Sequence, residues 1–153
     1  MKKSKTITNK TIPEEIRQLI TKVDIPNNVI RIGNVAFWGC RKLTSITIPD
    51  SVTRIGDFAF EECEGLSSVM IGDNVTSIGI CAFYGCSRLT NVTIPDHVTS
   101  IRDSVFFGCS RLTSVTIGNG VTSIEESAFK KCSGLTSVTI PDGVTNIERE
   151  AFS

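Results

Sequence analysis

The chain has few of the side chains on which enzymes depend. Its 153 residues include one histidine, one tryptophan and one tyrosine. His97 falls in a turn between repeats, away from cysteine or carboxylate groups at metal-ligand spacing, so we expect an exposed turn residue. The sequence also lacks a Gly-x-Ser-x-Gly elbow, a phosphate-cradling glycine-rich loop and an HExxH motif. It therefore predicts a protein that is not an enzyme and has no cofactor and no metal site.

The chain also lacks an excess of charge and a long apolar run. It has 16 acidic and 16 basic side chains, a balance that argues against general nucleic-acid binding. No apolar run approaches the roughly 20 residues of a membrane span. The basic residues 1–10 are not followed by the apolar core of a signal peptide, and we expect them to form a flexible tail. The protein either stays inside the cell or is the mature segment of an exported one.

One pattern fills the rest of the chain and returns every 23 residues. In its clearest copy, residues 121–143, it reads Val-Thr-Ser-Ile-Glu-Glu-Ser-Ala-Phe-Lys-Lys-Cys-Ser-Gly-Leu-Thr-Ser-Val-Thr-Ile-Pro-Asp-Gly. Five full copies run through residues 29–51, 52–74, 75–97, 98–120 and 121–143, and a partial sixth ends at Ser153. A unit this small cannot bury its apolar side alone, so the repeat indicates a stacked solenoid.

The apolar residues form columns when positions are counted from the start of each copy. Position 9 holds a phenylalanine column, which predicts a packed aromatic spine: Phe37, Phe60, Phe83, Phe106, Phe129 and Phe152. Position 12 holds a cysteine column: Cys40, Cys63, Cys86, Cys109 and Cys132. Parallel thiols suit a disulfide poorly and do not converge on a metal, so we expect buried free thiols. Cys81 lies off the column and is expected to be the accessible thiol.

Three segments of each unit have different local preferences. Positions 15–20 alternate and are rich in β-branched residues, which predicts a strand with one buried face. Positions 1–4 predict a shorter extended segment. Positions 6–11 place Ala-Phe among polar residues and favour a single helical turn. Stacked coils would align their strands in a parallel sheet.

The spacing Leu-x-x-Val-x-Ile-Pro-x-x-Val-x-x-Ile-x-x-x-Ala-Phe-x-x-Cys resembles the BspA-like class of leucine-rich repeat over residues 29–153. The resemblance implies an α/β repeat solenoid, a curved leucine-rich-repeat stack with a parallel β-sheet on the concave face and short helical turns on the convex side. Many members are bacterial or protist surface proteins that adhere to host matrix proteins or to other cells. The resemblance thus implies a secreted or cell-surface binding protein, but it transfers no ligand because the motif positions are core positions.

Residues 11–28 are expected to form an N-terminal capping helix and a partial repeat. The run from Thr11 to Glu14 resembles a capping box, and Ile12, Ile16, Leu19 and Ile20 would share one helical face that covers the stack. The alternative is a shortened coil that lacks its Ala-Phe section. In that reading residues 13–19 correspond to residues 49–55, and residues 20–26 to residues 43–49.

Two outward stripes are candidate binding sites. The first is the strand face at positions 16, 17 and 19, a nearly uncharged hydroxyl array that either recognises a protein or glycan or serves solubility. Its members are Thr44, Ser45, Thr47, Ser68, Met70, Asn91, Thr93, Ser114, Thr116, Ser137 and Thr139. The second, the aromatic–arginine stripe, has side chains typical of contact hot spots, although a partly buried rim also explains it. Its members are Trp38, Arg41, Tyr84, Arg88, Phe107 and Arg111.

These patterns lead to one functional prediction and two alternatives. The sequence predicts a non-enzymatic binding or adhesion module whose protein or glycan partner lies on the strand face. The first alternative is self-association, as a two-fold homodimer, through an uncapped strand edge in residues 121–143. The second is ice binding by the strand hydroxyls, which Met70 and the implied curvature argue against.

Overall fold

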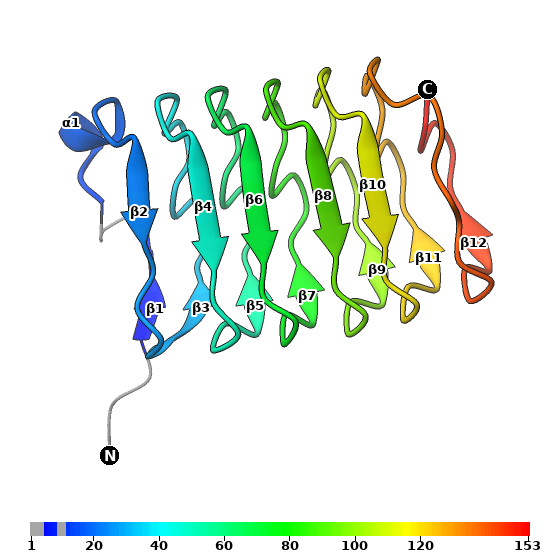
Figure 1. The fold of residues 1–153 in the computed structure, drawn as a ribbon, viewed down its shortest axis with the longest axis horizontal. Helices are drawn as coiled ribbons and strands as arrows, with labels where there is room; N and C mark the ends of the chain where they lie inside the picture. Colours follow the sequence, from blue (N-terminus) through cyan, green and yellow to red (C-terminus); the bar gives the residue numbers. More distant parts are fainter. Residues whose placement is uncertain (1–4, 9–11) are drawn as a thin grey trace.

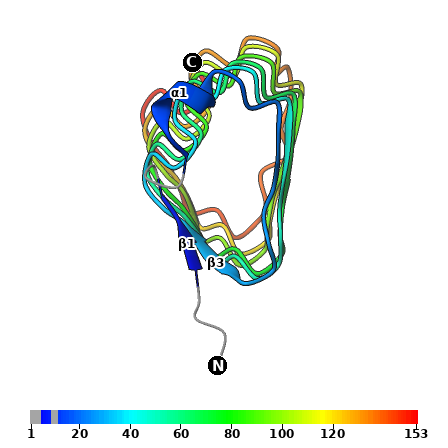
Figure 2. The same ribbon diagram turned by 90° about the vertical axis from the view of Figure 1, so that its left-hand side faces the viewer.

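The described residues, 5–8 and 12–153, wind into a stack of coils in this computed structural model (Figure 1). Strands of successive coils pair in parallel, so the predicted repeat solenoid is confirmed as a parallel β-solenoid of about six turns. Two rows of strands run along the stack on different sides of the coils, as the end-on view of Figure 2 shows. The core lies between these rows and a third side made of turns.

The longer strands form the first row. They are β2 (Lys22–Asp24), β4 (Ser45–Ile48), β6 (Ser68–Ile71), β8 (Asn91–Ile94) and β10 (Ser114–Ile117). Ser45 pairs with Ser68 and Thr47 with Met70, so the strands keep the 23-residue register of the sequence. In β4 the side chains alternate between exposed and buried, because successive residues of a strand point to opposite sides. The predicted strand face therefore lies outward along this row.

The shorter strands form the second row. They are β1 (Lys5–Ile7), β3 (Val29–Ile32), β5 (Arg54–Ile55), β7 (Ser77–Ile78), β9 (Ser100–Ile101), β11 (Ser123–Ile124) and β12 (Asn146–Ile147). The hydrogen-bonded order is β1-β3-β5-β7, followed by β9-β11-β12. The ladder is interrupted between β7 and β9, as it is between β6 and β8 in the longer row. The phenylalanine spine crosses the same region without a break.

The third side is built from tight turns instead of the helical turns that the sequence predicts. Position 7 has a positive φ in every copy, including Val35 at 52° and Phe58 at 57°, and this conformation interrupts a helix. Left-handed backbone costs a β-branched or bulky residue about 1–2 kcal/mol. Compensating hydrogen bonds join the coils: the Phe37 N–H donates to the Ala59 carbonyl at 2.7 Å, and the Phe60 N–H to the Ala82 carbonyl at 2.7 Å.

The phenylalanine column forms the continuous spine that the sequence predicts. The ring centroids of Phe37 and Phe60 lie 5.0 Å apart, with 3° between the ring planes. The widest step, between Phe83 and Phe106, is 5.5 Å. These steps are close to the strand spacing of roughly 4.8 Å, so ring stacking and strand pairing are satisfied together. The rings of Phe37, Phe60 and Phe83 are fully buried.

The N-terminal residues form a further coil, which agrees with one part of the alternative reading: residues 20–26 correspond to residues 43–49. Residues 5–7, expected in a flexible tail, form β1 and pair in parallel with β3. Lys22 of β2 pairs with Ser45 of β4, again 23 residues apart. Residues 1–4, 9 and 10 of the expected tail lie outside the described residues. The first coil is therefore not shortened, because β1 occupies the place of the short strand.

The predicted capping helix is reduced to the single turn α1 (Glu14–Arg17). Its N-cap is Pro13, which makes no side-chain cap hydrogen bond, while Thr11 of the expected capping box lies outside the described residues. Ile12 is buried in the core and Ile20 packs against it, but Ile16 and Leu19 are 44% and 66% exposed, so only half of the expected apolar face packs on the stack. The segment also adds polar contacts to the next coil, including a 3.2 Å hydrogen bond from Gln18 to the Gly39 carbonyl.

The C-terminal coil also departs from the sequence pattern. The predicted strand over residues 137–140 is absent, and the longer row ends at β10. The shorter row continues, because Ile147 of β12 pairs with Ile124 of β11. Leu135, Val138 and Ile140 are only partly buried against the core, since no further coil packs on them. The uncapped edge expected in residues 121–143 is therefore a partly exposed apolar segment and not a formed strand.

We predict that Phe83→Ala lowers the free energy of unfolding by roughly 3–5 kcal/mol. The substitution leaves a cavity between two stacked rings in the middle of the spine, where neighbouring coils hold the backbone in place. Urea unfolding followed by circular dichroism measures the change. Phe152→Ala, in the partly exposed last ring, is the matched control and should cost less. A loss below about 1 kcal/mol for Phe83→Ala would contradict the buried spine.

Candidate binding surfaces

The strand face carries no charge among its predicted members, but β2, at the start of the same row, adds exposed Lys22 and Asp24. All of its predicted members are exposed, and Met70 is the most apolar of them at 65% exposure. Its hydroxyl groups fall into two classes. The position-16 hydroxyls are used within the stack: Thr44 donates to the Thr21 carbonyl at 3.1 Å and Thr113 to the Thr90 carbonyl at 3.1 Å. This column therefore contributes to inter-coil bonding as well as to the surface.

The hydroxyl groups at positions 17 and 19 have no such partners. Ser45, Thr47, Thr93, Ser114 and Thr116 make no side-chain hydrogen bond to any described residue. Between paired strands these free hydroxyls repeat at the coil spacing, as Thr93 of β8 and Thr116 of β10 do, but Met70 of β6 interrupts the position-19 row between Thr47 and Thr93. The arrangement can donate and accept hydrogen bonds at regular intervals, as a repetitive partner would require.

The N-terminal part of the strand face is hollowed. A cavity of about 520 Å³ is lined by Thr47 and Met70 on the strands and by Asp50 and Asp73 in the turns that follow. A smaller hollow of about 250 Å³ lies beside it, next to Ser45. The Asp50 carboxylate accepts a 2.9 Å hydrogen bond from the Asp73 N–H, so it also fixes the turn of the next coil.

At the C-terminal end the face changes. Ser137 and Thr139 are exposed, but they lie on the irregular segment between β11 and β12 and not on a paired strand. The structure therefore does not bring them into the regular array formed by Thr93, Ser114 and Thr116. The sequence could not show this, since the copy in residues 121–143 matches the repeat at every core position.

The aromatic–arginine stripe is only partly assembled. Tyr84 and Phe107 stack with centroids 4.7 Å apart, and the Lys131 Nζ lies 5.2 Å from the Phe107 centroid. Trp38, 39% exposed, is separated from this pair by the coil that carries Glu61. Burial raises the pKa of the Glu61 carboxyl, a neighbouring Glu62 raises it further, and a hydrogen bond from Trp38 lowers it.

The arginines of the stripe differ in their surroundings. Arg41 forms ion pairs with Glu62 at 2.8 Å and Glu64 at 3.4 Å, and is therefore engaged within the fold. Arg88 and Arg111 are exposed and make no ion pair with a described residue. The usable part of the stripe is thus the Tyr84–Phe107 pair with these two guanidinium groups.

The six cysteines are free thiols, and those of the column are buried. Each thiol from Cys63 onward in the column donates to a phenylalanine carbonyl of the preceding coil, as Cys63 does to Phe37 at 3.2 Å. Burial raises the pKa of Cys86 and Cys109 well above the usual value and that of Cys132 to about 11. Cys81 is half-buried, and its pKa is also raised, first by burial and then by nearby carboxylates.

The His97 Nδ1 lies 2.9 Å from the Asp73 carbonyl, and the side chain is exposed in a turn, as the sequence indicates. Within residues 5–8 and 12–153, no group of three or more His, Cys, Asp or Glu side chains is arranged to hold a metal ion.

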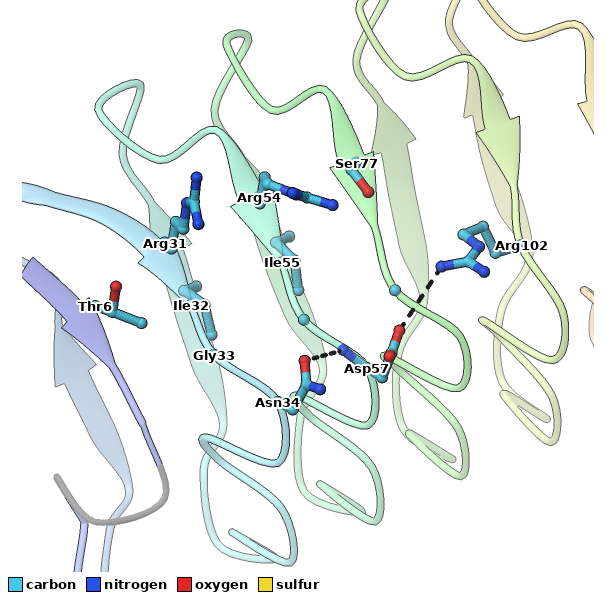
Figure 3. A pocket seen from close by; sticks show the side chains of 12 residues that line it. Thr6, Arg31, Ile32, Gly33, Asn34, Arg54, Ile55, Asp57, Ser77 and Arg102 are labelled. Carbon is cyan, nitrogen blue, oxygen red and sulfur yellow. Dashed lines mark hydrogen bonds and ion pairs between the residues drawn. The ribbon is translucent and has the colours of Figure 1, made fainter.

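A third surface, which we call the arginine groove, was not identified from the sequence. It is a cavity of about 350 Å³ on the shorter-strand side, lined by Arg31, Arg54, Ser77, Asn34, Asp57 and Arg102 around a floor of glycines (Figure 3). Its signal in the sequence is a deviation from the repeat. Position 3 is arginine in two copies but serine in the next three, and position 5 is glycine in three copies but charged in the others.

The model of the BspA type leucine-rich repeat region matches residues 5–133 and 65–153, with six copies. The chain belongs to this family. The matched range begins at β1, which agrees with the additional N-terminal coil. No curated protein matches the chain.

Three solved structures of bacterial repeat proteins are similar to this leucine-rich repeat chain. A leucine-rich repeat protein from Eubacterium ventriosum is 33% identical over 87% of the chain and 36% of its own length, with a TM-score of 0.82. A leucine rich cell surface protein from Faecalibacterium prausnitzii is 37% identical over 88% of the chain and 45% of its own length, with a TM-score of 0.62. A Bacteroides ovatus leucine-rich repeat protein is 31% identical over 84% of the chain and 45% of its own length, with a TM-score of 0.60.

The chain thus spans less than half the length of each of these proteins. The similarity covers the repeat stack and gives the fold of the shared part. In the part of the chain that the structure describes, no helix is long and apolar enough to cross a membrane.

Proposed function

We propose that this leucine-rich repeat chain is a non-enzymatic binding or adhesion module that holds a protein or glycan partner on its strand face. The observation that supports this most directly is the regular array of exposed hydroxyls without partners at positions 17 and 19. The similar Faecalibacterium protein is described as a cell surface protein. A location at the cell surface or outside the cell is part of the proposal.

The strand face is physically suited to binding. Threonine is stiff about χ1, and Thr47, Thr93 and Thr116 are held on paired strands, so little side-chain entropy is lost when a partner is bound. The hollow between Thr47 and Met70 adds an apolar contact to the hydrogen-bonding array. Methionine adapts its shape to a partner, which suits an exposed position beside a cavity.

The Tyr84–Phe107 pair with Arg88 and Arg111 is the alternative face for the same function. The rings of Tyr84 and Phe107 are stacked, and exposed aromatic and arginine side chains are typical of contact hot spots. We rank this stripe second for two reasons. Trp38 is separated from the aromatic pair by one coil, and Arg41 is engaged in ion pairs.

The functional proposal is tested with the double variant Thr93→Arg, Thr116→Arg. Two guanidinium groups on adjacent strands would block the array sterically and electrostatically, and we expect at least about a tenfold loss of affinity, or about 1.4 kcal/mol. Binding is measured on a glycan array and on immobilised matrix proteins, using the partner that the unaltered chain retains.

The matched control for this test is Thr122→Arg, Thr145→Arg. It adds the same two charges in neighbouring coils at exposed positions beside the shorter strands. Circular dichroism verifies that both variants fold. Affinity that is unchanged in the strand-face variant would place the site elsewhere, with the Tyr84–Phe107 stripe as the next candidate.

Self-association through the C-terminal coil is a second candidate function. It is supported by a hollow of about 290 Å³ lined by Phe129, Leu135, Val138 and Phe152, whose apolar side chains a second coil could cover. β10 also offers unpaired backbone groups at this end, because residues 137–140 do not form a strand.

This second candidate predicts a dimer in solution. Light scattering at tens of micromolar should give twice the chain mass of 16.6 kDa. Val138→Asp, a change at a partly buried position, should return the mass to that of one chain if folding is retained. A monomer for the unaltered chain at this concentration would contradict self-association.

A further inference from the structure

The arginine groove contains two like charges that the fold places side by side. Arg31 of β3 and Arg54 of β5 are direct partners in the parallel ladder, so their Cα atoms are one strand spacing apart, roughly 4.8 Å. Both side chains are exposed, and neither forms an ion pair or a hydrogen bond with a described residue. Like charges in directly paired positions destabilise a sheet. The arrangement therefore costs stability and receives no counter-ion from the described chain.

The floor of the groove is formed by glycines that the stacking requires. A Cβ added at Gly56 would lie 2.7 Å from the Gly33 carbonyl carbon, and one added at Gly79 would lie 2.5 Å from the Gly56 carbonyl carbon. No side chain fits at Gly56 or Gly79, so the surface between the arginines and the following turn stays open in these coils. In the next coil the same position is Arg102, whose side chain closes the end of the groove (Figure 3).

The remaining lining is polar and largely oriented by the fold. The Asn34 Oδ1 accepts a 3.0 Å hydrogen bond from the Asp57 N–H, which leaves the Asn34 amide NH₂ available. The Asp57 carboxylate accepts a 3.0 Å hydrogen bond from the Ile80 N–H and lies 3.8 Å from the Arg102 Nη1. Ser77 extends the Arg31–Arg54 row by one coil with a hydroxyl group. The lining thus holds three guanidinium groups and one carboxylate, and this carboxylate already accepts a hydrogen bond from the Ile80 N–H.

We propose that the arginine groove binds the anionic groups of an acidic glycan, a sugar chain that carries sulfate or carboxylate. Guanidinium groups bind both anions through paired N–H donors. The amide of Asn34 and the hydroxyl of Ser77 offer hydrogen bonds to sugar hydroxyls. No exposed aromatic or apolar side chain lines the groove, since Ile32 and Ile55 are buried. A peptide partner would ordinarily require an apolar anchor pocket, so the lining favours the glycan.

This site is separate from the strand face and does not depend on the function proposed for that face. Its charges are carried by the shorter strands β3 and β5, whereas the hydroxyl array lies on β4, β8 and β10. An acidic glycan in the groove would also offset the repulsion between Arg31 and Arg54. Binding at this site should therefore stabilise the fold.

The test measures binding of a heparin-derived hexasaccharide by isothermal titration calorimetry at low salt. We expect saturable binding that Arg31→Gln, Arg54→Gln weakens at least tenfold. Lys42→Gln, Arg149→Gln removes two exposed positive charges outside the groove and should change affinity less than twofold. Equal losses in the two double variants would mean that binding follows net charge, and would overturn the proposal.

Two further measurements define the ligand class and exclude a folding artefact. Urea unfolding should show that Arg31→Gln, Arg54→Gln is at least as stable as the unaltered chain, because the repulsion is removed. Neutral maltohexaose should not bind. A hexaglutamate peptide should bind at least tenfold more weakly than the hexasaccharide. Binding of this peptide with equal affinity would overturn the glycan assignment, and no saturable hexasaccharide binding would overturn the site.

Discussion

The structure depends on one constraint, which is that every coil repeats its backbone in register on the coil before it. The strands pair at an offset of 23 residues, and the phenylalanine rings stack at 5.0–5.5 Å, close to the strand spacing. Hydrogen bonds, ring stacking and burial all act between neighbouring coils, so each coil is stabilised by the two beside it. An insertion in one copy would break all three kinds of contact together.

This constraint explains both the strained turns and the freedom of the surface. The positive φ at Val35 and Phe58 persists because this turn geometry lets the backbone amides of the phenylalanine spine, such as that of Phe37, donate hydrogen bonds to the next coil. Outward-facing positions that make no bond to the next coil, such as Thr47 and Thr93, are free of this constraint and can vary. The hydroxyl array and the arginine groove are two different uses of this freedom on two sides of the same coils.

The core and the strands could be predicted from the sequence, because the repeat has the period of the structure. Phe83, Cys86 and Leu89 are buried as their columns indicate. The short strand of the first coil could not be predicted, because Lys5–Ile7 carries a single motif residue, Ile7, which pairs with Ile32. Residues 137–140 were mispredicted for the opposite reason: the strand motif is present, but no following coil covers its apolar side chains.

The candidate sites were only partly predictable. The exposed strand face follows directly from the alternation along β4 and β8. Only the structure shows that the Thr44 hydroxyl donates a hydrogen bond to the preceding coil and that the Thr47 hydroxyl does not. The arginine groove was not predicted, because its lining residues come from different positions of different copies. Only the stacking of the coils brings Arg54, Gly56 and Arg102 together in one cavity. The residues that every copy shares identify the core. Candidate binding residues are therefore better sought among the positions at which the copies differ.

Native-state hydrogen exchange tests the central claim, that the coils are stabilised by their neighbours as one cooperative stack. The amides of Phe60, Phe83 and Phe106 each donate to the following coil. We expect their protection factors to agree within about tenfold and to exceed those of residues 137–140 by at least about a thousandfold. A middle coil that exchanges as fast as residues 137–140 would show that the coils open independently, and would contradict the account.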